Sequence, residues 1–477
     1  MKKIRYKIIF SAIVCSLFII SCKTTKPLEN NTVKNMPQSF ATTKDSTNSA
    51  DINWKQYFTD PNLVELIDLS LKNNMDMSIA LQRIEAARAG MRLGKNALFP
   101  TLNANAAFWQ RKFGYYTMDD AGNRTTEIQP GVMVPTHLPD YFIGLQTSWE
   151  IDVWGKLRNK KKAAVARYLS SVEGKNVVLT NLIADIANSY YELLALDNEL
   201  DIIRETIKLQ ENALELITIQ KQAGVANELG VQQFQAQVFN SKALEYETTQ
   251  KITVCENKIN FLLGRYPQTI NRNKTELIKE LPFKPTVGIP SNLLKNRPDI
   301  KQAEFDLMAS KADVKAAKAA FYPSLNINGS IGFQAFKAGL LFTNPQSMAY
   351  SLLGNLVAPL LNRSAIKAEF KTANAMQQEA LFNYQKTILN GYVEVYNEVA
   401  KINSLEKIVD FKTKQVNTLT QAIETSSDLF KTGNASYIEV LMAQTGSLDS
   451  KLQLIDAKKR QYNALVDIYK ALGGGWK

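Results

Sequence analysis

Cys22 is the residue whose type and position most directly imply a chemical modification. It follows a basic start, a mainly apolar run (IIFSAIVCSLFII) and the small residue Ser21. A basic region before about a dozen apolar residues is typical of an export signal and is too short for a retained membrane helix. Because IISC has the pattern of a bacterial lipobox, we expect cleavage before Cys22 and lipid attachment to it. An ordinary export signal with a chance cysteine is the alternative, but the polar tether KTTKPLENNTVKN that follows favours a lipoprotein.

Other residue types that carry enzyme or metal chemistry are sparse. Cys15 leaves with the signal, so Cys255 is the only cysteine besides Cys22, and no disulfide framework is expected. His137 is the only histidine and falls in an expected loop. No Ser-His-Asp set, phosphate loop or pair of catalytic carboxylates occurs at a useful spacing. We therefore expect neither an enzyme nor a bound metal or cofactor.

The overall charge and hydropathy limit the partners. Loss of residues 1–21, which carry four positive charges, lowers the formal net charge from +12 to +8. This excess is weak evidence for nucleic acid, and no nucleic-acid partner is expected. No later stretch approaches the ~18 uninterrupted apolar residues of a membrane helix, so helices are not expected to cross a membrane.

The chain contains one unit written twice. Residues 71–105 and 294–328 align without a gap and share thirteen of thirty-five residues, including the pairs Pro100/Pro323 and Asn105/Asn328. Such self-similarity indicates duplicated structure. In each copy an alanine-rich helical segment (about 61–97 and 291–320) precedes an alternating segment after the proline. We assign 1–21 to the signal, 22–53 to the anchored tether, 54–270 to the first repeat and 271–477 to the second.

Two pairs of long helices follow the alternating segments. Apolar residues recur every three or four positions over about 159–222 and 364–431, and again over about 228–263 and 437–471. This spacing is typical of coiled-coil packing. Some sixty-five residues of helix extend roughly 100 Å. Gly224 and Gly433 lie between the helices of each pair, where a helix C-terminus needs a positive φ, so they mark antiparallel turns.

The alternating segments predict β-strands. TLNANAAF and SLNINGSIGF place Asn103, Asn105, Asn326 and Asn328 on one face and apolar residues on the other. Second strands are expected at 141–151 and about 349–358. In a water-soluble sheet the apolar face would meet a core. In an outer membrane it would meet lipid, while the asparagines would line a wet lumen.

Four strands per chain cannot close a barrel. An open sheet edge inside hydrocarbon leaves N–H and C=O groups unpaired, so the membrane interpretation requires several chains to share one barrel. Eight strands barely hold side chains, whereas twelve leave a channel. A trimer is therefore the smallest assembly that makes a pore.

Taken together, these features resemble those of the TolC-like outer-membrane factors, in particular the lipoprotein branch that serves resistance-nodulation-division efflux pumps. The resemblance covers about 54–476 and rests on the duplicated proline block, TSWEIDVWGKLRNKKKAA, LLKNRPDIKQAE, APLLNRSAIKAEF and YKALGGGW. It implies a mainly α chain with a membrane β-barrel: a homotrimer whose twelve-stranded barrel, set in outer-membrane lipid, continues into an α-helical barrel. It also implies a periplasmic adaptor and an inner-membrane pump as partners.

The resemblance further implies a gate near the helical turns, where carboxylates form rings. Matched by position, Glu439 takes one carboxylate place, while Met442 stands where a second acid often occurs. The alternative for Glu439 is a solvated charge on a helix. The segment KLRNKKK (156–162) is expected to be a solvated collar where barrel becomes helix, facing lipid phosphates; a binding site for an anion is the alternative.

Three functions are compared on this basis. The leading one is a passive outer-membrane exit channel for small molecules in a Gram-negative cell. The exit duct of a protein-secretion system uses the same architecture, and a lipid-anchored periplasmic coiled-coil scaffold without a pore is the alternative from another class. The lipobox and the ALGGGW end favour small-molecule efflux.

Overall fold

The computed structural model describes residues 37, 40, 48–281, 283–361 and 363–476. Contacts divide the chain into residues 1–36 and residues 37–477, and the architecture below is that of the second unit. Cys22 and most of the expected tether lie outside the described residues. The division into repeats at residue 270 stays a prediction.

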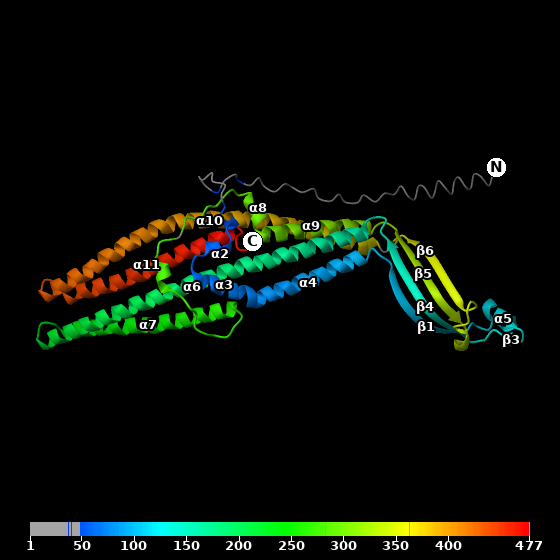
Figure 1. The fold of residues 1–477 in the computed structure, drawn as a ribbon, viewed down its shortest axis with the longest axis horizontal. Coiled ribbons are helices and arrows are strands. Elements are labelled where there is room, and N and C mark those ends of the chain that lie inside the picture. Colours follow the sequence, from blue (N-terminus) through cyan, green and yellow to red (C-terminus); the bar gives the residue numbers. More distant parts are fainter. Residues whose placement is uncertain (1–36, 38–39, 41–47, 282, 362, 477) are drawn as a thin grey trace. The chain divides into compact units, whose positions relative to one another are not determined.

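Four long helices form two hairpins (Figure 1). They are α6 (Lys156–Gln222), α7 (Glu228–Leu262), α10 (Arg363–Lys431) and α11 (Tyr437–Ala471). Gly224 and Gly433 have φ of 74° and 76° at the turns. In both turns the backbone N–H groups of the glycine and of the next residue bond back to the last helical turn, as in a Schellman motif. The expected helices and both turns are thereby confirmed.

The short helical segment of each copy is interrupted at one residue. The first copy has α3 (Pro61–Asn73) and α4 (Met75–Asn96), and the second has α8 (Asn292–Asn296) and α9 (Pro298–Ala319). The interrupting residues, Asn74 and Arg297, are 223 positions apart and both have extended backbone. Asn74 caps α4 through its side chain, whereas Pro298 disfavours helix at the residue before it. The expected continuous segments are therefore two helices each.

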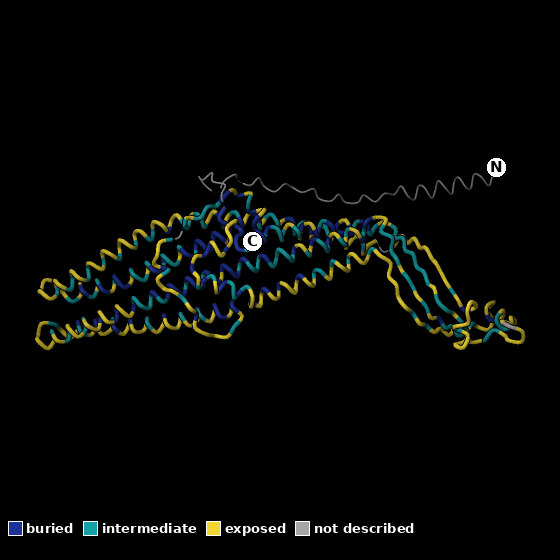
Figure 2. Tube along the Cα trace, in the orientation of Figure 1, coloured by how far each residue is buried: buried dark blue, intermediate teal, exposed yellow. Residues whose placement is uncertain are grey.

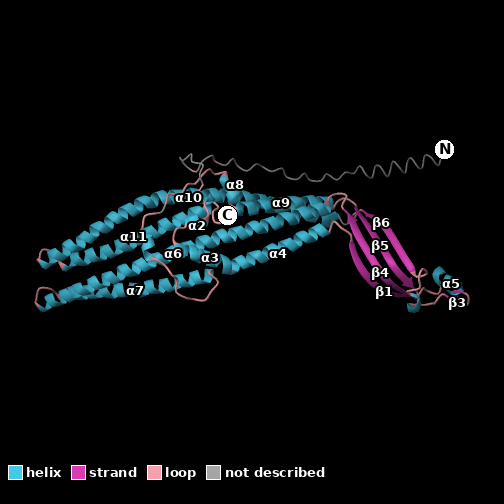
Figure 3. Cartoon of the chain, viewed as in Figure 1, coloured by secondary structure: helices cyan, strands magenta, loops and turns pink. Residues whose placement is uncertain are grey.

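The four main strands form one antiparallel sheet (Figure 3). Its order is β1 (Thr101–Arg111), β4 (Leu138–Ile151), β5 (Ser324–Ala335) and β6 (Met348–Val357). The β1–β4 connection holds α5 (Met118–Thr125) and the strands β2 (Glu127–Gln129) and β3 (Val132–Met133). Four short elements complete the described chain: η1 (Ser49–Asp51), α2 (Trp54–Tyr57), η2 (Lys274–Ile278) and η3 (Ala338–Leu340).

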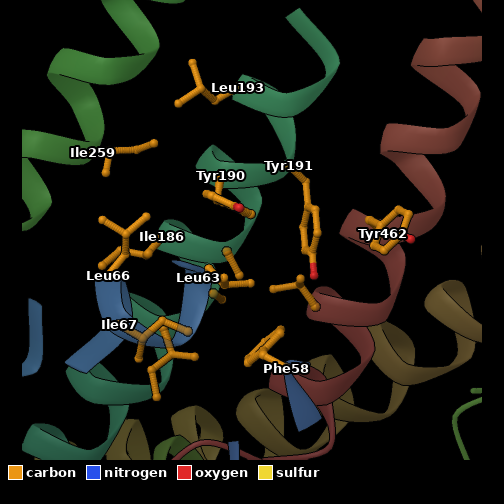
Figure 4. Packing of buried hydrophobic residues seen from close by; sticks show 14 of the residues in the cluster. Phe58, Leu63, Leu66, Ile67, Ile186, Tyr190, Tyr191, Leu193, Ile259 and Tyr462 are labelled. Atoms are coloured by element: carbon orange, nitrogen blue, oxygen red, sulfur yellow. The ribbon is translucent and has the colours of Figure 1, made fainter. Parts of the chain in front are cut away.

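The main core lies where α3, α7 and α11 pack on α6 (Figure 4). The Tyr190 hydroxyl donates to Asp60 Oδ2 at 2.6 Å, so the core is tied to the residue that caps α3. Tyr191 packs against Tyr462 of α11, with ring centroids 4.7 Å apart. Burial is concentrated in the helices (Figure 2). Phe142 is the one buried hydrophobic residue of the four main strands.

Each hairpin returns to the break between its short helices. Gly264, after α7, lies so close to Asn73 that an added Cβ would be 2.5 Å from the Asn73 carbonyl oxygen. Gly473, after α11, has the same relation to Asn296, also at 2.5 Å. The residue at each break makes a second contact with the returning hairpin, because its side chain donates a hydrogen bond to the last turn of α7 or α11. Asn74 donates to the Leu262 carbonyl at 2.9 Å, and Arg297 donates to the Ala471 carbonyl at 2.8 Å.

Candidate functional site

The strand register places the four predicted asparagines on one face of the sheet. Residues directly opposite each other in an antiparallel pair share a face. Asn103 is opposite Gln146, Gln146 is opposite Ser330, and Ser330 is opposite Ser351. A polar row therefore crosses all four strands, and the Ser330 and Ser351 hydroxyls are 2.8 Å apart.

The other three asparagines extend this polar face in both directions. Asn105 is one pleat from Asn103 and is opposite Gly144. Asn328 is opposite Ser148, and Asn326 is opposite Glu150 on one side and Asn355 on the other. The predicted alternation is confirmed by this register, and the assignment of the face to a lumen stays a prediction.

The opposite face is apolar and uncovered. Its cross-strand rows contain mainly aliphatic and aromatic side chains, and many of them are exposed. They include Leu102, Leu145, Ile331, Tyr350, Leu352 and Leu356. Large exposed apolar patches mark sites of protein or membrane contact. No part of the described chain supplies the core that a water-soluble sheet needs here.

Two paired glycines bend the sheet toward its polar face. Gly144 and Gly332 are directly opposite each other. A Cβ added to either would lie 2.6 Å from the Cα of the other, on the face that carries Asn105. The backbones therefore approach more closely on this face than side chains permit. The ring of Phe142 lies over Gly144. The polar face is consequently on the inside of the bend, which sequence reasoning missed, although the two glycines were visible within strand patterns.

Both edges of the sheet are open within the part of the chain that the structure describes. There β1 pairs only with β4, and β6 pairs only with β5. Each outer edge therefore presents a row of N–H and C=O groups available to another strand.

The hairpin tips hold the remaining predicted residues. Ile217, Phe234 and Val440 form a small apolar cluster that joins the two tips. Glu439, in the first turn of α11, is exposed. Its carboxylate accepts a hydrogen bond from the Ser436 N–H at 2.6 Å, while Ser436 caps the helix, so the two form a capping box. Glu439 thus has a structural role that sequence matching did not reveal.

Asp152 fixes the junction between β4 and α6. Its carboxylate accepts hydrogen bonds from the Leu157 N–H at 2.9 Å and from the Arg158 N–H at 2.8 Å. Burial raises the pKa of Asp152, but these bonds and the Arg158 guanidinium outweigh burial and hold the pKa below its ordinary value. The signal for this role is the DVWG motif, in which Asp152 stands three residues before Gly155 at φ 77°.

The two residues of reactive type that the structure describes lie apart from these features. His137 is exposed in the β1–β4 connection. Cys255 is buried in the main core, where its thiol donates to the Ser189 carbonyl at 3.2 Å. Burial raises the pKa of the Cys255 thiol to about 11, so the thiol stays protonated at neutral pH.

Neither a membrane-spanning helix nor a metal cluster is found among the described residues. None of their helices combines the length and the hydropathy that a membrane span requires. Nor does this part of the chain bring three His, Cys, Asp or Glu side chains together in a way that would hold a metal ion.

Comparison with known proteins gives matches over most of the chain. Residues 66–265 and 289–474 match the family model described as outer membrane efflux protein. The solvent efflux pump outer membrane protein SrpC of Pseudomonas putida is 30% identical over 88% of this chain and 87% of its own length. The probable outer membrane lipoprotein SilC of Salmonella typhimurium is 27% identical over 97% of this chain and 98% of its own. A crystal structure of CusC, a cation efflux system protein in Escherichia coli, has a TM-score of 0.78 and 25% identity over 92% of this chain and 97% of that one.

Proposed function

The chain belongs to the outer membrane efflux protein family, and from this premise we propose how it works as the exit channel of an efflux system. It resides in the outer membrane of a Gram-negative cell and extends into the periplasm. It acts as a passive duct for small molecules that an inner-membrane pump extrudes through a periplasmic adaptor. The family is one of channels rather than enzymes.

The observation that carries the proposal is the two-faced, open-edged sheet. Its apolar face meets lipid, and its polar face, which includes Asn103 and Asn328, lines the lumen on the inside of the bend. Because a membrane removes the water that would satisfy an open edge, β1 of one copy pairs with β6 of the next. Each copy supplies four strands, so two copies give eight and three copies give twelve. Twelve strands form the smallest of these barrels that leaves a channel.

Exposed apolar seams on the helices support the same assembly. On α7 and on α10, large apolar side chains recur every seven or eight residues and have no cover within the described chain. The α7 seam contains Phe239, Tyr246, Val254 and Phe261, and the α10 seam contains Phe382, Leu389 and Tyr396. A seam with this period packs against another helix. Different surfaces on the two sides of one chain make a head-to-tail interface, which closes into a ring.

Glu439 is proposed as a gate residue at the far end of the helices. Three copies around one axis bring three carboxylates together, and such a ring raises the pKa of its members and attracts cations. Because Met442 is exposed where a second acid is expected, block by divalent cations should be modest. The capping box separates the two roles of Glu439. Glutamine also serves in a capping box, so Glu439→Gln removes the charge alone and Glu439→Ala removes both.

Single-channel recording on reconstituted trimers tests the gate. We expect Glu439→Gln to weaken divalent-cation block and cation preference with trimer assembly unchanged. We expect Glu439→Ala to do the same and also to loosen the tip of α11. Equal block in wild type and Glu439→Gln would show that Glu439 is a helix cap only.

The cargo is proposed at the level of class. SrpC is named for solvents and CusC for cations, although both have similar identity to this chain. Similarity therefore supports efflux of small molecules without selecting between these classes. We propose that selection occurs in the pump, because the proposed lumen face of the sheet is an open surface of amides and hydroxyls with the carboxylates Asp140 and Glu150 among them.

Cysteine labelling tests the proposed barrel. In a Cys255→Ser background, single cysteines replace Asn103 or Asn326 on one face and Leu102 or Leu325 on the other. We expect a membrane-impermeant thiol reagent to label the first pair through the lumen and to leave the second pair unlabelled in lipid. Heat-modifiable, trimer-sized migration in mild detergent distinguishes a duct from a scaffold. A reversed labelling pattern, or a conducting monomer, would refute the shared barrel.

A further inference from the structure

All four junctions between a main strand and a long or short helix share one arrangement. An exposed apolar side chain lies beside the strand, and a cation at the adjoining end of the helix lies three or four residues from it along the chain. The pairs are Phe99 with Lys95, Trp154 with Arg158, Tyr322 with Lys318, and Leu360 with Arg363. The chain therefore presents two neighbouring sets of residues where its helices meet its strands: an apolar level beside the strands and a cationic level at the helix ends.

The apolar level is held in place by hydrogen bonds and stacking. The Trp154 indole N–H donates to the Pro323 carbonyl at 2.7 Å, and its ring stacks on Tyr322 with centroids 4.8 Å apart. The Trp149 indole N–H donates to the Leu98 carbonyl at 3.0 Å. Tryptophan and tyrosine are enriched where a membrane meets water, because their rings are both apolar and polar.

The cationic level holds most of the net charge of the chain. Residues 92–100, 150–162, 313–324 and 357–369 contain eleven lysines and arginines against four acidic residues, an excess of seven out of a chain total of +12. We call these four segments the junction collar. They are far apart in sequence, and the fold gathers them where helices become strands (Figure 1).

Ion pairs occupy most of the acids of the collar and leave lysines over. Glu150 pairs with Lys156 at 2.5 Å, Asp152 pairs with Arg158 at 3.0 Å, and Asp313 pairs with Arg167. Several lysines of the collar make no ion pair with any described residue. They include Lys95, Lys160, Lys162 and Lys318.

The opposite end of the hairpins carries the reverse charge. Residues 211–239 and 424–442, around the two turns, each contain three acidic residues and one lysine. The collar is therefore a local feature, and the charge is polarised along the helices.

We propose that the junction collar binds the headgroups of anionic phospholipids at the membrane surface. The apolar level lies at the boundary between headgroups and hydrocarbon, and the unpaired lysines contact the phosphates on the helix side of it. This proposal rests on the proposed function, because it requires the sheet to be in the membrane. It adds a preference for anionic over zwitterionic lipid, since juxtamembrane lysines gain attraction from net negative surface charge.

Lipid binding to the full-length, delipidated protein in detergent tests the proposal. Native mass spectrometry measures the affinity for phosphatidylglycerol and for phosphatidylcholine with the same acyl chains. The triple variant Lys95→Gln, Lys162→Gln and Lys318→Gln removes lysines of the collar. The matched control, Lys208→Gln, Lys251→Gln and Lys407→Gln, removes three exposed lysines of the helices beyond it.

We expect wild type and the control to prefer phosphatidylglycerol. We expect the collar variant to bind that lipid at least tenfold more weakly, since each lysine near an anionic surface contributes about a fivefold effect. Equal binding of the two lipids by wild type, or equal loss in both triple variants, would refute the proposal. Displacement of phosphatidylglycerol by millimolar inorganic phosphate would also refute it, because the collar would then recognise a free anion.

Trimer migration and conductance, measured on the same samples, separate this inference from the proposed function. A conducting trimer without lipid preference refutes the collar proposal alone. A protein that neither forms a trimer nor conducts refutes the proposed function, and with it the lipid site.

Discussion

Replacement of Arg297 is the sharpest test of how the helices are held together. Its guanidinium donates to both carboxylate oxygens of Asp299, at 3.0 and 2.6 Å, to Glu394 at 2.6 Å and to the Ala471 carbonyl at 2.8 Å. One side chain thereby connects α9, α10 and the end of α11. Trp476 strengthens the same contact, because its indole N–H donates to the Asn296 carbonyl at 2.8 Å.

The magnitude follows from the exposure of the three charges. The Arg297 side chain is 8% exposed, whereas those of Asp299 and Glu394 are 32% and 42% exposed. Removing one partner of a buried ion pair costs about 3–5 kcal/mol. Because both acids keep contact with water, we expect Arg297→Met to cost about 3 kcal/mol, at the lower end of that range. Arg297→Lys should cost less stability than Arg297→Met but should still be less stable than wild type, since an ammonium cannot bond both carboxylate oxygens in the same plane.

The assay is the rate of unfolding at a fixed high temperature, because a membrane trimer is expected to unfold irreversibly. A loss of about 3 kcal/mol, expressed entirely in unfolding, corresponds to a rate increase of about 100-fold. Arg204→Met is the control, since Arg204 and Glu245 form an exposed pair at 2.8 Å that contributes at most about 1 kcal/mol. The reasoning would be refuted if the Arg297→Met variant unfolded at the same rate as wild type, or if Arg297→Met and Arg204→Met raised the unfolding rate equally.

Three further predictions concern the sheet, its junction and the N-terminus. Gly144→Ala and Gly332→Ala should each lower the yield of folded trimer on a gel, because an added Cβ would clash with the backbone of the opposite strand. Gly354→Ala should leave the yield unchanged, because no atom lies within 4 Å of a Cβ added there. Asp152→Asn should destabilise the junction at neutral pH. The pKa of Asp152 is depressed, so the ionised carboxylate contributes its full stabilisation above the ordinary carboxyl pKa of about 4. This stabilisation is lost as the pH falls through the pKa of Asp152 in the folded state. A difference in melting temperature between Asp152→Asn and wild type that persists in acid would contradict this account. Cys22→Ser should weaken membrane anchoring without abolishing the fold, and mass spectrometry that finds an unmodified Cys22 in the wild type rejects lipidation.

Much of the architecture was readable from local sequence patterns. The long helices begin and end within a few residues of the predicted bounds, because apolar periodicity and glycine turns are local properties. The alternation of Asn103 and Asn105 likewise predicted a strand with a polar face. The duplicated block predicted that Asn326 and Asn328 would repeat this arrangement. The family resemblance rested on several motifs spread along the chain, and it covers nearly the whole expected mature chain.

The partners of those motifs were decided by the tertiary structure. Nothing local in LLKNRPDI or ALGGGW shows that Arg297 meets Ala471, or that Gly473 lies against Asn296. The break at Asn74 was also missed, because the cap depends on one side-chain hydrogen bond, from the Met77 N–H to the Asn74 amide oxygen. The capping box of Glu439 was hidden in the same way, since position matching registers a charge and not its hydrogen bond.

The direction of the sheet's bend and the junction collar depend on contacts between segments far apart in the chain. Gly144 and Gly332 act together only because the register sets them opposite each other. The lysines of the collar come from four segments. The run KLRNKKK (156–162) was visible in the sequence, but only the fold brings the cations of the other three segments to the same junctions. Sequence determines the period and the turns of each element, since these depend on neighbours along the chain. Register, closure and surface charge depend on which elements meet in space, and that information enters with the tertiary structure.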